Sequence, residues 1–195
     1  MSLVSYALIS LADLKEALSI TGTSDDALLT NIINRATDII ERYCNGRRFA
    51  STTYTNEEYD GTGTNYINLK HYPITSLTAY EKNTGSLGNP NWEALESDYI
   101  TYLGDEGQVY YELGPFERGV KNYRFSYVAG YSTIPNDLQQ ACITLCSYLK
   151  NVTKGTGLRS ESLGEYSYTK EEDVNATIKN LGLDEILDVY KTPVI

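Results

Sequence analysis

The sequence of 195 residues has few of the side chains that bind metals or anions. It contains one histidine, three cysteines, and 16 lysines and arginines against 26 aspartates and glutamates, for a formal net charge of −10. A protein metal site needs three or four ligands, so we expect no bound metal. A surface that grips DNA or an anionic membrane needs clustered lysine and arginine, so the charge disfavours both of these functions.

Long apolar runs and a basic N-terminal region are also missing. No run reaches the roughly 18 apolar residues of a membrane-spanning helix, and Ser5 and Ser10 interrupt the apolar stretch in "MSLVSYALISLADLK". We therefore expect no transmembrane helix and no targeting segment. The length favours one domain, with room for an additional subdomain.

Recognisable catalytic or ligand-binding motifs are absent as well. The glycine-rich "GTGTNYINLK" lacks the Gly-Lys-Ser/Thr of a phosphate-binding loop and is interpreted as a hairpin turn. Three thiols are interpreted as buried free cysteines in a reducing cytoplasm: Cys44, Cys142 and Cys146. Three acid pairs are expected to be solvated charges in turns or arms: Glu57/Glu58, Asp105/Glu106 and Glu171/Glu172. No histidine or lysine base lies near a plausible serine or cysteine nucleophile in the sequence, so we predict no catalytic activity.

Three segments have the periodicity of amphipathic helices. Residues 11–18 follow a capping box formed by Ser10 and Asp13. Residues 25–44 have an apolar face made of Leu28, Leu29, Ile32, Ile33, Ala36, Ile39, Ile40 and Tyr43. Residues 137–152 have an apolar face made of Leu138, Ala141, Cys142, Leu145, Leu149 and Val152. Because each long helix needs a partner for its apolar face, we predict that these two helices pack together.

The segment between the long helices has a different composition. Residues 50–130 contain 11 of the 18 tyrosines, the only tryptophan, and 11 acidic against five basic side chains. Short runs such as "YINL", "ITSLTAY", "DYITYL" and "QVYYEL" are typical of strands between glycine-containing turns. In "YRFSYVA", one face of the predicted strand carries Tyr123, Phe125, Tyr127 and Ala129, which alternate with Arg124, Ser126 and Val128. We predict an antiparallel β subdomain that is sandwich- or barrel-like.

The predicted fold class is therefore α+β. A small helical bundle frame is formed by residues 1–49 and 131–157, and the β subdomain at 50–130 is inserted into it. The stretch 154–173 is rich in glycine and serine, and residues 158–172 within it are predicted to be an extended arm. Residues 173–195 are predicted to form a C-terminal helical tail whose apolar positions are Ile178, Leu181, Leu183, Ile186, Leu187 and Val189.

Two places outside the arm are candidates for contacts with another subunit. Arg42, Arg47 and Arg48 surround the end of the second helix, where cations suit the helix dipole; an inter-subunit contact through Arg47 and Arg48 is the alternative. Tyr110 and Tyr111 are adjacent on one predicted strand, so their side chains point to opposite faces. One of them, for which Tyr110 is our candidate, is expected to face outward, either packing on the sheet or forming an interface.

The order of these segments resembles that of a known family. The segments are "SLADLKEAL", "DDALLTNIINRATDIIERYCNGRRF", "HYPITSL", "YVAGYSTIPNDLQQACITLCSYL" and "SESLGEYSYT". Together they are similar to the head–tail connector proteins of long-tailed bacteriophages, which are also called adaptor or head-completion proteins. The resemblance covers nearly the whole chain, and "AGYSTIPNDLQQA" and "SESLGEYSYT" are its most specific parts. Some members are smaller and nearly all-helical, so the size of the insertion at 50–130 is a departure from the family.

The resemblance implies a structural virion protein of the head–tail junction that is assembled in the host cytoplasm. It implies a ring of about a dozen subunits beneath the portal protein, which extends the DNA channel and docks a tail-side head-completion or tail terminator protein. It also implies that DNA passes without sequence-specific binding, and that the protein has no enzymatic activity, no cofactor and no membrane partner. The acidic composition suits a channel through which DNA must move.

We expect the arm to contact an adjacent subunit or the portal. Its isolated apolar side chains cannot form a core of their own, but its alternating pattern permits an added strand whose two tyrosines fill pockets. The expected contact residues are Leu158, Arg159, Ser160, Glu161, Ser162, Leu163, Gly164, Glu165, Tyr166, Ser167 and Tyr168.

Two other functions stay open at this point. A ligand- or carbohydrate-binding β module would use an exposed Trp92 and tyrosines as stacking platforms. A cytosolic enzyme would need a polar pocket that the chain assembles only in three dimensions.

Overall fold

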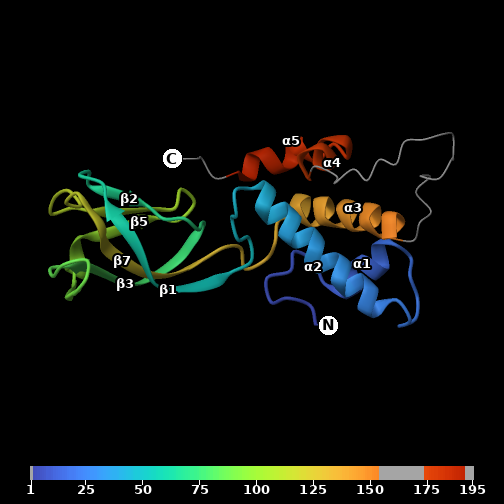
Figure 1. The fold of residues 1–195 in the computed structure, drawn as a ribbon, viewed down its shortest axis with the longest axis horizontal. Helices are drawn as coiled ribbons and strands as arrows, with labels where there is room; N and C mark the ends of the chain where they lie inside the picture. The colour runs from blue at the N-terminus through green and yellow to red at the C-terminus, as the bar shows by residue number, and fades with distance from the viewer. Residues whose placement is uncertain (1, 154–173, 192–195) are drawn as a thin grey trace. The chain divides into compact units, whose positions relative to one another are not determined.

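The computed structural model describes residues 2–153 and 174–191, and the chain forms two compact units. The helical unit is drawn from residues 1–47 and 133–195, and the β unit consists of residues 48–132. The β unit thus interrupts the helical unit in sequence (Figure 1). The predicted α+β class, with helices and antiparallel sheets, is confirmed.

The two long helices of the helical unit, α2 (Asp26–Tyr43) and α3 (Asn136–Thr153), pack against each other as their apolar faces predicted (Figure 1). Their buried side chains are Leu29, Ile32, Ile33, Ala36 and Ile40 in α2, and Leu138, Ala141, Cys142, Leu145, Cys146 and Leu149 in α3. One predicted core position is wrong. Val152 is 49% exposed, because it lies in the last turn of α3, one residue before the helix ends.

Local hydrogen bonds explain where α1 (Leu11–Ala17) begins and where α2 ends. The predicted capping box is present: the Asp13 N–H donates to Ser10 Oγ (3.1 Å), and the Ser10 N–H donates to the Asp13 carboxylate (2.9 Å). Beyond α2, Asn45 (φ 62°) and Gly46 (φ 77°) turn left-handed, and their N–H groups donate to carbonyl oxygens of the last helical turn. Asparagine tolerates this conformation and glycine adopts it freely, so the helix stops there.

The C-terminal tail forms α4 (Val174–Asn180), α5 (Asp184–Leu187) and a 3₁₀ turn, η2 (Asp188–Tyr190). The helical path breaks at Gly182, which has a φ of 66°. Contacts of α4 with α2 and of α5 with α3 bury Ile178, Leu183 and Leu187. Val189, predicted to lie on the apolar face, is 79% exposed, because the 3₁₀ turn changes the helical period at this position.

The β unit contains two antiparallel sheets that share one core. The larger sheet contains, in spatial order, β1 (Thr52–Gly61), β7 (Gly119–Ala129), β3 (Ile74–Asn83) and β4 (Trp92–Ala94). The smaller sheet contains β2 (Tyr66–Asn68), β6 (Gln108–Tyr111) and β5 (Ile100–Leu103), which follows a short 3₁₀ helix, η1 (Ser97–Tyr99). Both sheets contribute to a core made of Tyr59, Ile67, Leu69, Ile74, Val109, Phe116, Tyr123, Phe125, Tyr127 and Ala129. Of the two arrangements predicted for the β subdomain, sandwich-like or barrel-like, the structure has the sandwich.

Individual β segments both confirm and correct the sequence-based expectations. In β7 the predicted alternation is observed, since Tyr123, Phe125, Tyr127 and Ala129 are buried and the residues between them are only half-buried. The hairpin predicted for "GTGTNYINLK" is wrong. β1 pairs with β7 and β2 pairs with β6, so this loop crosses from one sheet to the other.

A bulge in β1 changes which of its side chains face the core. The pairing of β1 with β7 shifts between Tyr54 and Glu57, where Asn56 has a φ of 53°. Before the shift the more buried side chains are Thr52 and Tyr54, and after it they are Glu57 and Tyr59. One extra residue reverses the two-residue alternation of a strand. Glu57 therefore points to the same side of the sheet as the aromatic core.

Candidate functional site

Arg47, one of the two arginines considered for an inter-subunit contact, lies inside the helical unit. It is 4% exposed, and its Nη1 donates to the carbonyl oxygen of Tyr190 (3.0 Å). The Tyr190 hydroxyl in turn donates to the Asp137 carboxylate at the start of α3 (2.8 Å). Arg47 thus links the end of α2 to the C-terminal tail within one chain, and its contact with another subunit stays a prediction. Arg48 is half-buried in the β unit.

Tyr110 is the outward-facing member of the tyrosine pair on β6. Its ring centroid lies 5.7 Å from that of Tyr66 on β2, and its hydroxyl donates to Gln108 Oε1 (2.8 Å). The neighbouring Tyr111 points to the other face, where its ring lies 5.8 Å from the core residue Phe116. The smaller sheet therefore carries a pair of half-buried tyrosine rings on its outer face.

The predicted contact segment of the arm, 158–168, lies outside the described residues, and so does the acid pair Glu171/Glu172. The described chain stops at Thr153, the last residue of α3, and resumes at Val174, the first residue of α4. The contacts of the arm therefore stay a prediction.

Trp92 does not form the exposed platform that a carbohydrate-binding module would need. It is half-buried on β4, and the guanidinium of Arg124 lies over its ring, 4.4 Å from the centroid. Glu81 holds this guanidinium through two hydrogen bonds of 2.6 and 3.0 Å. A protein cation already covers one face of the ring, so the carbohydrate-binding alternative loses its main residue.

Glu57 is the centre of a hydrogen-bonded cluster in the β unit. Its carboxylate accepts hydrogen bonds from the hydroxyls of Tyr59 and Tyr127, whose oxygens lie 2.9 Å apart. The same carboxylate lies 3.4 Å from Lys70 Nζ and 3.8 Å from Nε2 of His71, the only histidine. The expectation that Glu57 is a solvated charge in a turn is wrong, because the bulge in β1 directs its side chain inward.

The surroundings of the cluster determine which of its members are protonated at neutral pH. Burial raises the pKa of both Tyr59 and Tyr127, so their hydroxyls stay protonated and donate. Burial also acts to raise the pKa of Glu57, but the hydrogen bonds from the two tyrosines, together with the electrostatic attraction of His71 and Lys70, outweigh it and hold that pKa below its usual 4.5. Glu57 is therefore an ionised acceptor at neutral pH.

His71 is kept neutral beside this carboxylate. Burial lowers the pKa of His71 below 6.5; the opposing attraction of Glu57 is the next largest effect, and the positive charges of Lys70 and Arg48 add to the lowering. Its ring stacks on that of Tyr54 with centroids 4.0 Å apart. Its Nδ1 is buried and has no hydrogen-bond partner in the described part of the chain. Protonation would thus create a buried N–H without an acceptor.

The chemistry of this cluster is that of a structural core. Besides the links between β1 and β7, the Lys70 N–H donates to the Tyr59 hydroxyl (3.1 Å), which attaches the loop after β2. Among residues 2–153 and 174–191, no group of three or more His, Cys, Asp or Glu side chains could hold a metal ion. The three cysteines are buried free thiols, as predicted, and burial raises the pKa of Cys44 to about 12.

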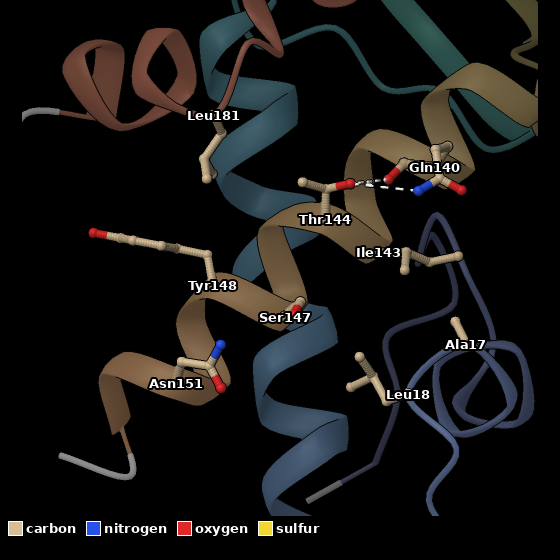
Figure 2. A pocket seen from close by; sticks show the side chains of 9 residues that line it. All are labelled: Ala17, Leu18, Gln140, Ile143, Thr144, Ser147, Tyr148, Asn151 and Leu181. Atoms are coloured by element: carbon tan, nitrogen blue, oxygen red, sulfur yellow. Dashed lines mark hydrogen bonds between the residues drawn. The ribbon is translucent and has the colours of Figure 1, made fainter. Parts of the chain in front are cut away.

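A groove with a volume of about 460 Å³ lies along α3 in the helical unit (Figure 2). One wall consists of α3 residues at helical spacing: Gln140, Ile143, Thr144, Ser147, Tyr148 and Asn151. The end of α1, with Ala17 and Leu18, and the turn after α4, with Leu181, complete the lining. The Thr144 hydroxyl is held by its own helix, since it donates to the Gln140 carbonyl oxygen (3.0 Å). None of the lining residues carries a charge.

Reasoning from the sequence missed this groove. It identified the buried stripe of α3, which begins with Leu138, but not the second stripe beside it. The available signal was the spacing of Gln140, Thr144, Ser147 and Asn151, whose small or polar side chains leave room on one face of the helix. None of the helices in residues 2–153 and 174–191 is long and apolar enough to span a membrane.

The sequence pattern of one protein family, described as "HCP: Head completion protein", matches residues 7–191. The match runs through the helical unit, the β unit and the C-terminal tail. The chain belongs to the head completion protein family. The resemblance to phage head–tail connectors is thus confirmed, and with it the interpretation of this head completion protein as a structural protein of phage assembly. No curated protein matches the sequence.

Solved structures of similar fold belong to a gene transfer agent (GTA) particle. The head completion protein matches a chain in the neck of the empty GTA particle, computed with C6 symmetry, with a TM-score of 0.64, 13% identity and coverage of 100% of this chain and 96% of that chain. A chain in the neck of the native particle, computed with C12 symmetry, matches with a TM-score of 0.54, 14% identity and coverage of 100% and 94%. A chain in the virion of the native particle matches with a TM-score of 0.53, 16% identity and coverage of 100% and 95%. These likenesses establish that the α+β fold occurs in a neck protein.

Proposed function

We propose that this protein is a structural component of the head–tail junction of a bacteriophage-like particle. In this function it forms a ring beneath the portal, continues the DNA channel and presents a docking surface for the tail-side protein. The observation that supports the proposal most strongly is the family match over residues 7–191. The similar fold of chains from necks with C6 and C12 symmetry adds to it, because a symmetric neck is built from identical copies related by rotation.

The charge of the chain suits a wall along which DNA slides. The net charge is −10, and residues 50–130 alone carry 11 acidic and five basic side chains. DNA binds a protein strongly when lysine and arginine neutralise its phosphates. A predominantly acidic protein therefore lets DNA pass without holding it and without reading its sequence.

Residues 158–168 are the proposed contact with an adjacent subunit or the portal. Tyr110 and Arg48 are further candidates, both half-buried in the β unit. The ring of Tyr110 lies beside that of Tyr66 on the outer face of the smaller sheet, and tyrosine is enriched where proteins meet. A partner that covers these two rings would bury aromatic area at a small cost in side-chain entropy.

The proposal is tested by adding the purified protein to DNA-filled heads that carry a portal but lack this protein. We expect it to co-sediment with the heads and to form a ring of density at the portal vertex in electron micrographs. Heads without a portal are the control and should bind none. Failure to bind portal-bearing heads, or equal binding to both kinds of head, would contradict the proposal.

A further inference from the structure

We infer that the groove along α3 is the docking site for the arm of a second copy of this chain, and that Tyr166 and Tyr168 of that copy enter it. The inference rests on the proposed function, because a ring places copies of the chain side by side. It is carried by the chemistry of the groove, by the spacing of the arm residues, and by the positions at which the described chain stops and resumes.

The groove suits large uncharged side chains. Leu18, Ile143, Leu181 and the ring of Tyr148 supply apolar surface, and Ser147 and Thr144 supply hydroxyl groups. No lining residue is charged, although the chain contains 26 acidic and 16 basic residues. An apolar side chain can therefore enter without stripping water from a charged group. The volume of about 460 Å³ lies within the roughly 300–1,000 Å³ of typical ligand pockets.

The arm carries side chains of matching kind and spacing. In "SESLGEYSY" three large residues are separated by serine, glycine and glutamate. In an extended segment Tyr166 and Tyr168 point to the same side, about 7 Å apart. Successive turns of a helix repeat every 5.4 Å or so, so the two tyrosines would meet consecutive turns of α3, near Thr144 and Ser147.

The ends of the described chain place the arm within reach of such a groove. α3 ends at Thr153, two residues beyond Asn151 in the groove lining, and α4 begins at Val174. Fully extended, residues 154–173 would span about 65 Å. They can therefore extend about 30 Å away and return, which exceeds the roughly 27 Å length of an 18-residue helix such as α3.

Exchange of arms suits a closed ring. Each copy would give one arm and receive one, which is a heterologous contact that repeats around the ring and leaves every groove filled. The contact can be weak for two free copies and still hold in the ring, because neighbouring sites raise the effective concentration. If each groove bound the arm of its own chain instead, its occupancy would not depend on assembly of the ring.

The test replaces Tyr166 of the full-length chain with the photo-crosslinking residue p-benzoylphenylalanine. After incorporation into portal-bearing heads, irradiation should produce a covalent species of two copies, and peptide mass spectrometry should place the crosslink between 140 and 151 of the second copy. Crosslinks that lie only within one chain, that join the arm to the portal, or that leave α3 unmodified would each overturn the inference.

Variants of the groove provide the matched controls. Ser147→Arg places a long charged side chain in the groove and should lower the crosslink yield about tenfold, which corresponds to roughly 1.4 kcal/mol of lost contact. Gln140→Arg tests the same point at an exposed position, in case Ser147→Arg impairs folding. Asn31→Arg, at an exposed position of α2 outside the groove, should leave the yield unchanged. Equal yields in all three variants would also overturn the inference.

The outcomes separate this inference from the proposed function. If the protein joins portal-bearing heads but its arm crosslinks elsewhere, the docking site is wrong and the proposed function stands. If the protein does not join the heads at all, the proposed function is wrong and the inference is overturned with it.

Discussion

The packing between α2 and α3 in the helical unit is mainly aliphatic, whereas in the β unit the largest buried side chains are aromatic and two of them share a carboxylate. Ile33, Leu138 and Leu145 are fully buried between α2 and α3. In the β unit, Tyr59 and Tyr127 are buried together and both donate to Glu57. The contact between α2 and α3 depends on aliphatic packing at such positions, and the β unit depends on holding the charge of Glu57 in a defined arrangement of donors.

The comparison explains why the two units should respond differently to substitution. Aliphatic packing offers no polar partner to an introduced charge, so a single charged substitution causes a large loss of stability. A hydrogen-bonded cluster loses stability in smaller steps, one donor or one proton at a time. Trp92, the only tryptophan, lies in the β unit, so its fluorescence reports on that unit while helical circular dichroism reports on the other.

The largest effect is expected for Ile33→Asp. Ile33 is fully buried, and an unpaired carboxylate at this position should reduce the free energy of unfolding by more than about 3 kcal/mol. Leu145→Asp, on the facing helix, should have the same effect. The measurement is denaturant unfolding followed by circular dichroism at 222 nm.

Val152→Asp is the matched control, because Val152 is 49% exposed on the same helix as Leu145. It should change the free energy of unfolding by less than about 0.5 kcal/mol. A wild-type-like transition for Ile33→Asp would show that α2 and α3 do not form the core described above.

A smaller effect is expected for Tyr127→Phe in the β unit. The substitution removes the hydroxyl that donates to Glu57 and contacts the Tyr59 hydroxyl, and leaves a half-buried carboxylate short of one donor. The free energy of unfolding should fall by about 1–3 kcal/mol, measured by urea unfolding followed by Trp92 fluorescence. Tyr102→Phe, which removes an exposed hydroxyl bonded to the Thr75 carbonyl oxygen, should have a smaller effect; equal losses would argue against a special role for the cluster.

The β unit should also lose stability when the pH falls below about 6.5. Burial lowers the pKa of His71 in the folded state, with Glu57 opposing and Lys70 and Arg48 assisting. Below 6.5 the unfolded chain therefore binds more protons than the folded chain, so stability decreases as the pH decreases, until the lowered folded pKa is passed. Glu57, whose pKa is held below 4.5, adds a second loss at lower pH.

The measurement is urea unfolding of the wild type and His71→Asn at pH 7.5 and 5.5. The wild type should lose stability between these values, and the variant should lose less. A wild-type stability that rises towards pH 5.5 would show that the attraction of Glu57 exceeds the effect of burial.

The smallest effect on stability is expected for deletion of 160–168. Folding of this segment alone would not offset an ordering cost of about 1–2 kcal/mol per residue, so its removal should change the free energy of unfolding by less than about 0.5 kcal/mol. Incorporation into portal-bearing heads should nevertheless be abolished. Thermal melting and co-sedimentation with heads measure the two effects.

A variant with Leu163, Tyr166 and Tyr168 all replaced by Ser keeps the length of the arm and should lose incorporation to the same extent. An arm deletion that unfolds the protein would place the arm in the core. Normal incorporation of the shortened protein would show that the arm is dispensable.

The elements formed by local patterns were largely predictable. The helix expected at 25–44 is observed at Asp26–Tyr43, and the helix expected at 137–152 at Asn136–Thr153. The capping box of Ser10 and Asp13 is present because its donors and acceptors lie within one turn. The family resemblance was also readable, since it depended on the order of these elements.

The candidate site was less predictable, because it depends on residues that are distant in sequence. Arg47 was considered a cation that suits the dipole at a helix end, but it is buried and its Nη1 donates to the carbonyl oxygen of Tyr190, 143 residues later. Glu57 was considered a solvated acid, but the bulge at Asn56 directs it to the interior. The groove on α3 exists only because Leu18 and Leu181 approach the same helix from separate segments.

The sequence by itself determined the helices and most strands, the pairing of two apolar helical faces, and the family. Each of these follows from side-chain periodicity and capping over a few turns, where neighbours in sequence are neighbours in space. Only the tertiary structure decided that Glu57 is half-buried among Tyr59, Tyr127 and His71, and that an uncharged groove opens along α3. The physical reason is that a one-residue shift in strand phase and the approach of distant segments set the surroundings of a side chain, and neither is encoded in its immediate neighbours.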